Sequence, residues 1–232
     1  MNEISMKNKF LVSVVLLMAL FTLSSFTDGP DYTNTYMNGH EYVDLGLSSG
    51  TKWATCNVGA SKPEEYGGYY AWGETEEKDD YGWWDTYKWC EGDQWSMTKY
   101  CTHSYYGKID NKTVLEPQDD VAHVKWGGTW RMPTIEEIKE LQNECTWQWT
   151  SRRGVDGYRV IGSNGKSIFL PAAGYHLGTL YFSGSYGYYW SSSLYSASAC
   201  AYNLGFEGGY FAWYGNSDAP RYYGCSVRPV SE

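Results

Sequence analysis

The residues best suited to chemistry are aromatic and gather in the last third of the chain. Between positions 195 and 223, tyrosine and tryptophan rings accompany asparagine, aspartate and arginine on predicted short strands and turns. Rigid amphipathic rings beside adaptable polar groups are typical of surfaces that recognise a ligand. Because side chains alternate along a strand, about half of these residues are expected to face a core. The predicted ligand-binding residues are Tyr195, Tyr202, Tyr210, Trp213, Tyr214, Asn216, Asp218, Arg221, Tyr222 and Tyr223.

Residue types that support catalysis or metal binding are present without a typical arrangement. The four histidines lack the short spacings of zinc ligands, and no Ser-His-Asp arrangement can be placed. Glu116, Asp119 and Asp120 could offer oxygen ligands to calcium. Two of them, however, fall in the first turn of a predicted helix, where acids stabilise the helix dipole without a metal. We therefore predict no catalytic residue, no metal site and no cofactor.

Composition restricts the class of partner. The 232-residue chain contains 12 Trp and 23 Tyr, which is more than core filling needs, so some rings are expected to face solvent. Its formal net charge is −9, and it has no basic cluster to oppose phosphate groups. This charge pattern argues against nucleic acid and anionic lipid as partners. The expected ligand is a glycan or a protein.

The N-terminal segment has the layout of a secretory signal. Lys7 and Lys9 precede an apolar run from Phe10 to Phe21, and small and polar residues follow. The run is shorter than the roughly 20 apolar residues that cross a bilayer, so membrane contact is expected only through an uncleaved leader. We predict a signal peptide over residues 1–25, a polar tether over 26–39 and one folded domain over 40–232. The expected location is secreted or in the cell envelope.

The elements that must position these residues are mainly strands. Runs of β-branched and aromatic residues flank turns rich in glycine, asparagine and serine, which is the signal of antiparallel hairpins. The predicted strand pairs are Tyr42–Leu47 with Thr51–Cys56, Tyr158–Ile161 with Ser167–Leu170, and Ala199–Phe206 with Tyr210–Tyr214, followed by a closing strand over Gly224–Val230.

Two short helices and a long loop region complete the prediction. Pro117–Trp126 opens with a proline at a first helical position and ends at a glycine pair. Thr134 and Glu137 match a capping box, and apolar residues follow at helical spacing. The aromatic stretch over 74–106 has no period and predicts long, internally packed loops with a solvated acidic face.

The six cysteines permit up to three disulfides in an exported chain. Spacing alone cannot choose among the 15 connectivities that six cysteines allow. Cys200 and Cys225 both fall in predicted C-terminal strands and could face each other, whereas Cys145 on the apolar helix face is expected to be a buried thiol. We predict at most one or two bridges.

Seven short blocks along the chain resemble a known family, the Fibrobacter succinogenes major paralogous domain, over about residues 41–230. The blocks are Tyr42–Gly50, Trp53–Gly59, Tyr70–Thr75, Trp130–Thr134, Leu170–Gly174, Tyr189–Ser193 and Ser226–Val230. The resemblance implies the C-type-lectin-like fold, which is shared with formylglycine-generating enzymes and with the variable proteins of diversity-generating retroelements. The paired cysteines of the former are absent here, and the latter use the fold as a scaffold for changeable ligand contacts.

Taken with the resemblance, the residues predict an α+β protein with the C-type-lectin-like fold. Trp130, Arg131, Trp190 and Arg228 are expected to be scaffold residues. The expected function is an exported ligand-binding or adhesion module that uses its aromatic C-terminal surface and is not an enzyme. Two alternatives stay open. One is an envelope hydrolase or modifying enzyme with an unidentified carboxylate pair, and the other is a structural cell-surface component.

Overall fold

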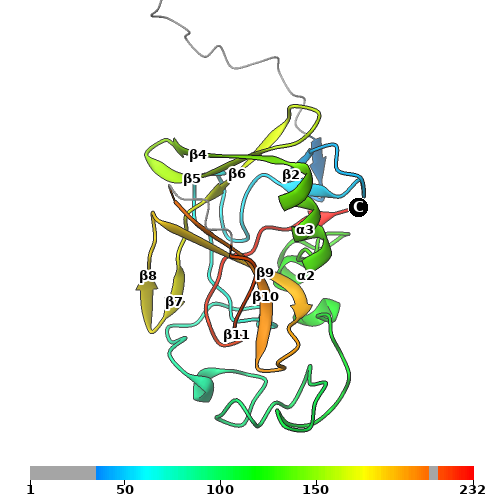
Figure 1. Ribbon diagram of the computed structural model, residues 1–232, viewed down its shortest axis with the longest axis vertical. Helices are drawn as coiled ribbons and strands as arrows, with labels where there is room; N and C mark the ends of the chain where they lie inside the picture. The colour runs from blue at the N-terminus through cyan, green and yellow to red at the C-terminus, as the bar shows by residue number, and fades with distance from the viewer. Residues whose placement is uncertain (1–34, 209–213) are drawn as a thin grey trace, which may run out of the picture. The chain divides into compact units, whose positions relative to one another are not determined.

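The computed structural model describes residues 35–208 and 214–232 (Figure 1). They contain mostly antiparallel sheets with two short α-helices, which confirms the predicted α+β class. The predicted signal peptide over 1–25 and residues 26–34 of the predicted tether lie outside the described residues. In the part of the chain that is described, no helix is long and apolar enough to cross a membrane.

One sheet unites the two ends of the described chain. Its strands, in spatial order, are β1 (Thr35–Met37), β2 (His40–Asp44), β3 (Lys52–Ala54) and β12 (Val230–Ser231). The pairing of β2 with β3 confirms the first predicted hairpin. Strand β1 falls within the predicted tether, so the sheet begins before His40. The reason is the Asn38-Gly39 turn, in which both residues have a positive φ, as a tight hairpin requires.

A second sheet is formed by residues between 146 and 171. It has the order β4 (Thr146–Arg152), β5 (Val155–Ile161) and β6 (Ser167–Pro171). Its β5–β6 pairing confirms the predicted hairpin around the Asn-Gly turn. Strand β4 was not predicted from the sequence. It joins β5 through a two-residue turn at Arg153-Gly154, where φ is 50° and 83°.

The predicted ligand-binding segment belongs to a third sheet, which has the order β11 (Tyr214–Pro220), β10 (Cys200–Glu207) and β9 (Tyr186–Leu194). A short hairpin of β7 (Tyr175–Leu177) and β8 (Thr179–Tyr181) precedes it. The partner of β10 was predicted over Tyr210–Tyr214, but β11 begins where that prediction ends. Residues 209–213 lie outside the described residues.

The predicted closing strand over Gly224–Val230 forms only at its end. Cys225 pairs with Tyr70 and Ser226 with Tyr189 as isolated bridges, and β12 starts at Val230. The segment changes partner along its length, and Pro229 has no N–H to offer a ladder. It therefore crosses the interior and links separate elements instead of extending one sheet.

Both predicted helices are present, the first with an interruption. Residues Pro117–Asp119 form the 3-10 helix η2, and α2 covers Val121–Trp126. Asp120 separates them because its carboxylate accepts hydrogen bonds from the backbone N–H groups of Ala122 and His123 as the N-cap of α2. Helix α3 (Ile135–Glu144) starts at the predicted capping box of Thr134 and Glu137. Its apolar face packs into the core, with Ile135, Ile138 and Leu141 buried.

The predicted long loops are confirmed. Between β3 and η2 the only helical element is the 3-10 helix η1 (Trp84–Thr86), and Figure 1 shows the teal to green part of these loops away from the β4–β6 sheet. The scaffold residues Trp130, Trp190 and Arg228 are buried as predicted, and Arg131 is half-buried.

No disulfide forms, because all six cysteines are free thiols. Cys225 is fully buried in the core cluster that contains Trp72 and Trp190. Cys200 lies on β10, where burial and the neighbouring Asp218 carboxylate raise the pKa of its thiol to about 12. Cys145 is the C-cap of α3 and is half-buried. The helical spacing had predicted a fully buried thiol, but the helix ends before this residue.

Candidate functional site

The predicted ligand-binding residues are distributed between surface, interior and undescribed positions. Asp218 is exposed on β11, and Tyr195, Tyr202 and Tyr223 are half-buried. The rings of Tyr195 and Tyr202 meet edge to face with centroids 4.9 Å apart. Tyr210 and Trp213 lie outside the described residues, as do the side chains of Tyr214 and Asn216, whose backbones belong to β11.

Arg221 is corrected from a ligand contact to a structural residue. Its side chain is fully buried. The guanidinium donates to the Tyr87 hydroxyl at 2.8 Å and to the carbonyl oxygens of Lys99, Tyr100 and Ser198 at 3.1, 3.2 and 2.9 Å. These bonds explain its burial, since the long loops have few backbone partners and their carbonyl groups must be satisfied by side chains.

Tyr222 is also buried, but it connects the interior to a row of rings at the surface. Its ring lies 6.2 Å from that of Trp83, which is 60% exposed, and 5.0 Å from that of Tyr223. Tyr223 stacks on Tyr175 with centroids 5.2 Å apart and planes 2° from parallel. The predicted residues therefore form one end of a larger aromatic surface.

The rest of that surface comes from β7, β8 and β9. Tyr175 contacts the rings of Tyr181, Phe182 and Tyr188 at 5.8, 6.1 and 5.1 Å, and Phe182 contacts Tyr186 at 4.9 Å. Phe182 and Tyr181 are 53% and 41% exposed. We call this set the aromatic strip, and its members are Trp83, Tyr175, Tyr181, Phe182, Tyr186, Tyr188, Tyr222 and Tyr223.

Local backbone geometry fixes the strip. Gly174 has a φ of +66°, and a Cβ there would lie 2.1 Å from the carbonyl oxygen of Tyr181, so only glycine allows the β7–β8 hairpin to fold back this closely. Phe182 itself has a positive φ of 56°, which turns the chain at the end of β8. The residues from 175 to 188 were not predicted as part of the ligand-binding surface. The signal in the sequence is the density of rings there, which continues into the predicted segment over 195–223.

A second group of exposed rings lies in the long loops. Trp95 and Tyr105 are 45% and 59% exposed, and their centroids are 4.5 Å apart. Tyr106 stacks near Trp95 at 5.8 Å, and its buried side packs on the cluster that contains Tyr222. This region was predicted only as internally packed loops, so the exposure of these rings is a finding of the structure.

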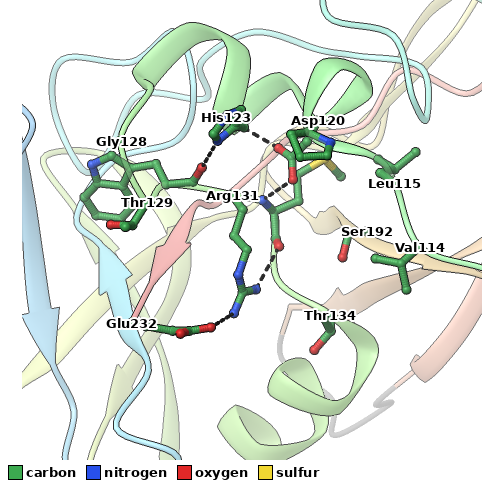
Figure 2. A pocket seen from close by; sticks show the side chains of 13 residues that line it. Val114, Leu115, Asp120, His123, Gly128, Thr129, Arg131, Thr134, Ser192 and Glu232 are labelled. Carbon is green, nitrogen blue, oxygen red and sulfur yellow. Dashed lines mark hydrogen bonds and ion pairs between the residues drawn. The ribbon is translucent and has the colours of Figure 1, made fainter.

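A cavity of about 390 Å³ opens between α2 and the segment that leads into α3 (Figure 2). Its walls are largely apolar and include Val114, Leu115 and Met132. Asp120 lies at its inner side, where burial raises the pKa of the carboxyl group against the opposing effect of three backbone N–H donors. The Nδ1 atom of His123 lies 3.2 Å from the carbonyl oxygen of Trp130. Asp120 and His123 thus already have hydrogen-bond partners within the protein.

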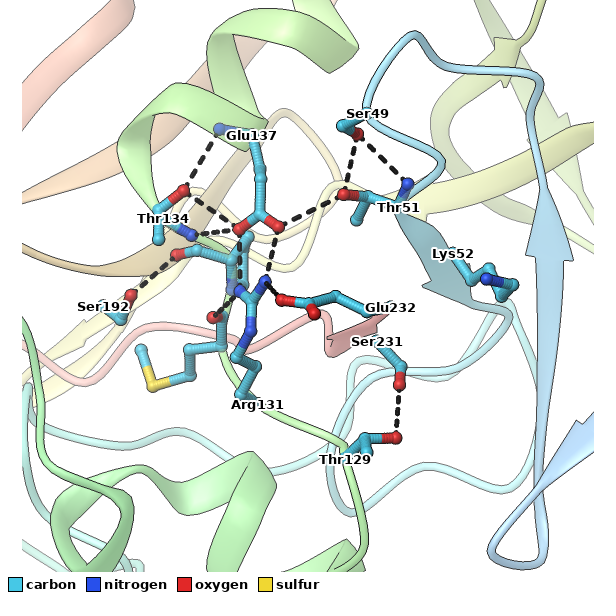
Figure 3. Close-up of polar contacts among 12 residues, drawn as sticks. Ser49, Thr51, Lys52, Thr129, Arg131, Thr134, Glu137, Ser192, Ser231 and Glu232 are labelled. Atoms are coloured by element: carbon cyan, nitrogen blue, oxygen red, sulfur yellow. Dashed lines mark hydrogen bonds and ion pairs between the residues drawn. The ribbon is translucent and has the colours of Figure 1, made fainter.

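The rim of this cavity is held by an ion-pair network (Figure 3). Arg131 donates two hydrogen bonds to Glu137, at 2.8 and 2.7 Å, and contacts Glu232 at 3.4 Å. The same Glu137 carboxylate completes the capping box with Thr134 and accepts from the hydroxyl of Thr51. These interactions lower the pKa of Glu137 despite its burial. The network fixes α3 against the sheet of β1, β2, β3 and β12, which we call the terminal sheet, and leaves Glu137 no free oxygen for catalysis.

The three carboxylates considered for calcium are used by the protein. Glu116 and Asp119 share Lys99, while Asp120 caps α2. Within the described residues, no group of three or more histidine, cysteine, aspartate or glutamate side chains is arranged to hold a metal ion.

Comparisons with protein-family models, with curated proteins and with solved structures found no match to this chain. Geometry and residue chemistry therefore carry the argument about function.

Proposed function

We propose that this protein is an exported ligand-binding or adhesion module that recognises a glycan or a protein through the aromatic strip. The observation that carries the proposal is a series of ring contacts from Trp83 through the buried Tyr222 to Tyr223, Tyr175 and Phe182, with exposed rings at both ends. Contiguous apolar surface that stays exposed in a folded protein commonly marks an interaction site.

The chemistry of the strip suits a ligand with flat, weakly polar faces. Its members are seven rings of tyrosine and phenylalanine and one of tryptophan, and none carries a formal charge at neutral pH. Tyrosine offers a rigid apolar face together with a hydroxyl that tolerates water. The apolar face of a sugar ring or an aromatic side chain of a partner protein can stack on such a surface without leaving a buried charge unpaired.

We also propose that the chain is a member of the Fibrobacter succinogenes major paralogous domain family and has the C-type-lectin-like fold. The seven sequence blocks support this assignment, and so does their convergence in the interior. Trp72 donates its indole N–H to the carbonyl oxygen of Ser191, and Trp190 donates to that of Tyr70. Blocks far apart in sequence thus complete each other's hydrogen bonds in one shared interior.

Export to the cell envelope or beyond is part of the proposal and rests on the predicted leader over residues 1–25.

The proposal is tested by screening the mature protein on a glycan array and against envelope proteins, followed by titration of any ligand found. The double substitution Tyr181→Ala with Phe182→Ala removes two exposed rings of the strip, and we expect affinity to fall at least about tenfold, which corresponds to about 1.4 kcal/mol. Tyr36→Ala is the matched control, because Tyr36 is 66% exposed on β1 and outside the strip.

Three results would count against the proposal. Unchanged affinity in a folded double variant would exclude the strip as the site. Hydrolysis of a bound glycan would favour the alternative of an envelope enzyme, and polymerisation of the purified protein without any ligand would favour a structural component.

A further inference from the structure

Lys99 has an unusual position at the edge of the long loops. Its Nζ atom lies 2.5 Å from Oδ2 of Asp119 and 2.6 Å from Oε2 of Glu116. The side chains of Lys99 and Asp119 are only 17% and 4% exposed. The rings of Trp89 and Tyr100 flank the amine, with centroids 5.0 and 4.9 Å from Nζ. An amine and a carboxyl group are thus held in contact in a largely enclosed place.

The groups around this contact are arranged for proton transfer. The hydroxyl of Tyr100 donates to the same Oδ2 of Asp119 at 2.6 Å. It also accepts from the backbone N–H of Glu116 at 3.0 Å. The other oxygen of Glu116 accepts from Lys112 at 2.6 Å, which fixes the carboxylate beside the amine of Lys99. The site therefore combines a nucleophile, a carboxyl carbon, a proton carrier and a hydrogen-bond donor on the oxygen that would leave.

We propose that Lys99 and Asp119 become joined after folding by an amide bond between Nζ and Cγ, with Glu116 carrying the proton. This is a covalent modification of the chain by its own side chains, and it is independent of the ligand bound at the aromatic strip. No enzyme, metal or nucleotide is required.

The reaction balances as a condensation. The lone pair of the neutral Lys99 amine forms the new N–C bond, and the bond between Cγ and Oδ2 breaks. Of the three protons of the original ammonium group, one stays on the amide nitrogen and two leave with Oδ2 as water. Glu116 accepts a proton from Nζ and returns it to the departing oxygen, so it ends unchanged. Tyr100 stabilises the charge that develops on that oxygen.

The charged pair is the starting state, and a proton must leave Lys99 before its amine can react. The two carboxylates raise the pKa of Lys99 above its ordinary value, and the two lysines hold the pKa of Glu116 at about 2. The reactive neutral amine of Lys99 is therefore a minor population, and bond formation is expected to be slow. Intramolecular placement compensates, because groups held in reacting geometry behave as if at about 10⁵–10⁸ M.

The bond would tie together a region that has no other covalent constraint. All six cysteines are free, and the segment from 89 to 119 contains no helix or strand before η2. An amide between positions 99 and 119 would fix the loop against the last residue of η2 and close the segment between them. Such a tie restricts the unfolded chain in the way that a disulfide does.

The test is the intact mass of the purified, folded protein. We expect a mass lower by one water than the sequence of the mature chain, and a proteolytic product in which the peptides containing Lys99 and Asp119 are linked. A mass equal to the sequence, with the two peptides recovered separately, would overturn the proposal and leave an ordinary ion pair.

Variants assign the roles. Lys99→Arg keeps the charge but should abolish the mass loss, and Glu116→Gln should abolish or greatly slow it. Asp119→Asn should form the same amide with loss of ammonia, so its product should have the same mass as the wild-type product. Lys112→Arg is the control and should still lose water, because it touches Glu116 without supplying the nucleophile. Mass loss in Lys99→Arg would show that a different group reacts and would refute the assignment.

Discussion

Two fully buried arginines hold two differently built halves of the molecule. Arg228 donates to Asn57 Oδ1 and to the carbonyl oxygens of Ala54, Thr55 and Phe169, and so joins the terminal sheet to the β4–β6 sheet. Arg221 donates to the carbonyl oxygens of Lys99 and Tyr100 in the long loops and to that of Ser198 between β9 and β10. In the sheet-built half, the arginine supplements backbone ladders. In the loop-built half, comparable side-chain bonds take the place of the ladders.

This difference explains why one arginine was interpreted correctly and the other was not. Arg228 belongs to a short recognisable block, and a scaffold role was predicted for it. Arg221 stands among tyrosines and polar residues, and in sequence that setting is typical of a binding surface. The lesson is that an arginine near exposed rings can be the interior support of those rings.

The largest expected effect is the loss of Arg221. In Arg221→Met, three carbonyl groups and the Tyr87 hydroxyl lose a buried donor, and we expect the free energy of unfolding to fall by about 3–5 kcal/mol. Hydrogen exchange should become faster over residues 97–102 while β5 and β6 stay protected. Arg228→Met is the matched variant and should instead expose the amides near Ala54. Equal loss of protection in both halves would contradict the comparison.

A second variant removes another substitute for backbone pairing in the loops. Asp110 accepts from the backbone N–H groups of Tyr100, Cys101 and Lys112 at 2.8, 2.9 and 3.1 Å. Asp110→Ala should lower the free energy of unfolding by about 2 kcal/mol in urea denaturation, because hydrogen bonds to a charged group are lost. A change below about 0.5 kcal/mol, the size of an ordinary surface substitution, would show that the loops do not depend on this side chain.

The sheet-built half offers a weaker counterpart in the capping box of α3. Thr134→Ala removes the acceptor for the backbone N–H of Glu137, and the expected cost is about 1 kcal/mol by thermal or chemical denaturation. Thr134→Ser keeps a hydroxyl and should restore most of the loss. If serine and alanine behaved alike, the methyl group and not the cap would be responsible.

The smallest expected effect is a difference in how Asp110 and Asp120 contribute to stability at acid pH. The pKa of Asp110 is lowered by the backbone N–H groups, so its contribution to stability is present above its unfolded pKa and is lost as the pH falls through the folded value. Burial raises the pKa of Asp120, so its contribution has the opposite sign and improves as the pH falls. The pKa of an unperturbed aspartate is about 3.9, so the free energy of unfolding is best followed from about pH 6 to about pH 3. As the pH falls over this range, the free energy of unfolding should decline less steeply in Asp110→Asn and more steeply in Asp120→Asn than in the wild type.

Local signals predicted much of the sheet-built half and little of the loop-built half. The β2–β3 and β5–β6 hairpins and the start of α3 depend on turn residues and on a capping box, which act over a few positions. Asn38-Gly39 is also a hairpin turn signal and would have predicted β1, but these residues fall in the segment over 26–39 that was predicted to be a tether. The free cysteines and the burial of Arg221 depend on contacts between distant segments, and spacing along the chain does not encode them.

The candidate site was predicted only at one end for a related reason. Tyr223 and the buried Tyr222 were chosen from the density of rings in the last segment. The exposed end of the aromatic strip, at Tyr181 and Phe182, depends on the hairpin that Gly174 allows to fold back. Residue composition indicated that rings face solvent, but the fold decides which of them meet.

The pairing of β12 with β3 also sets the order in which the protein can be completed. Val230 lies opposite Trp53, and Arg228 reaches Ala54 across 174 positions of the chain. During synthesis, β3 has no partner on the side of β12 until almost all of the domain has been made. Contacts of such long range in sequence also form slowly. The early hairpin therefore passes through a period in which its open edge needs protection from other chains.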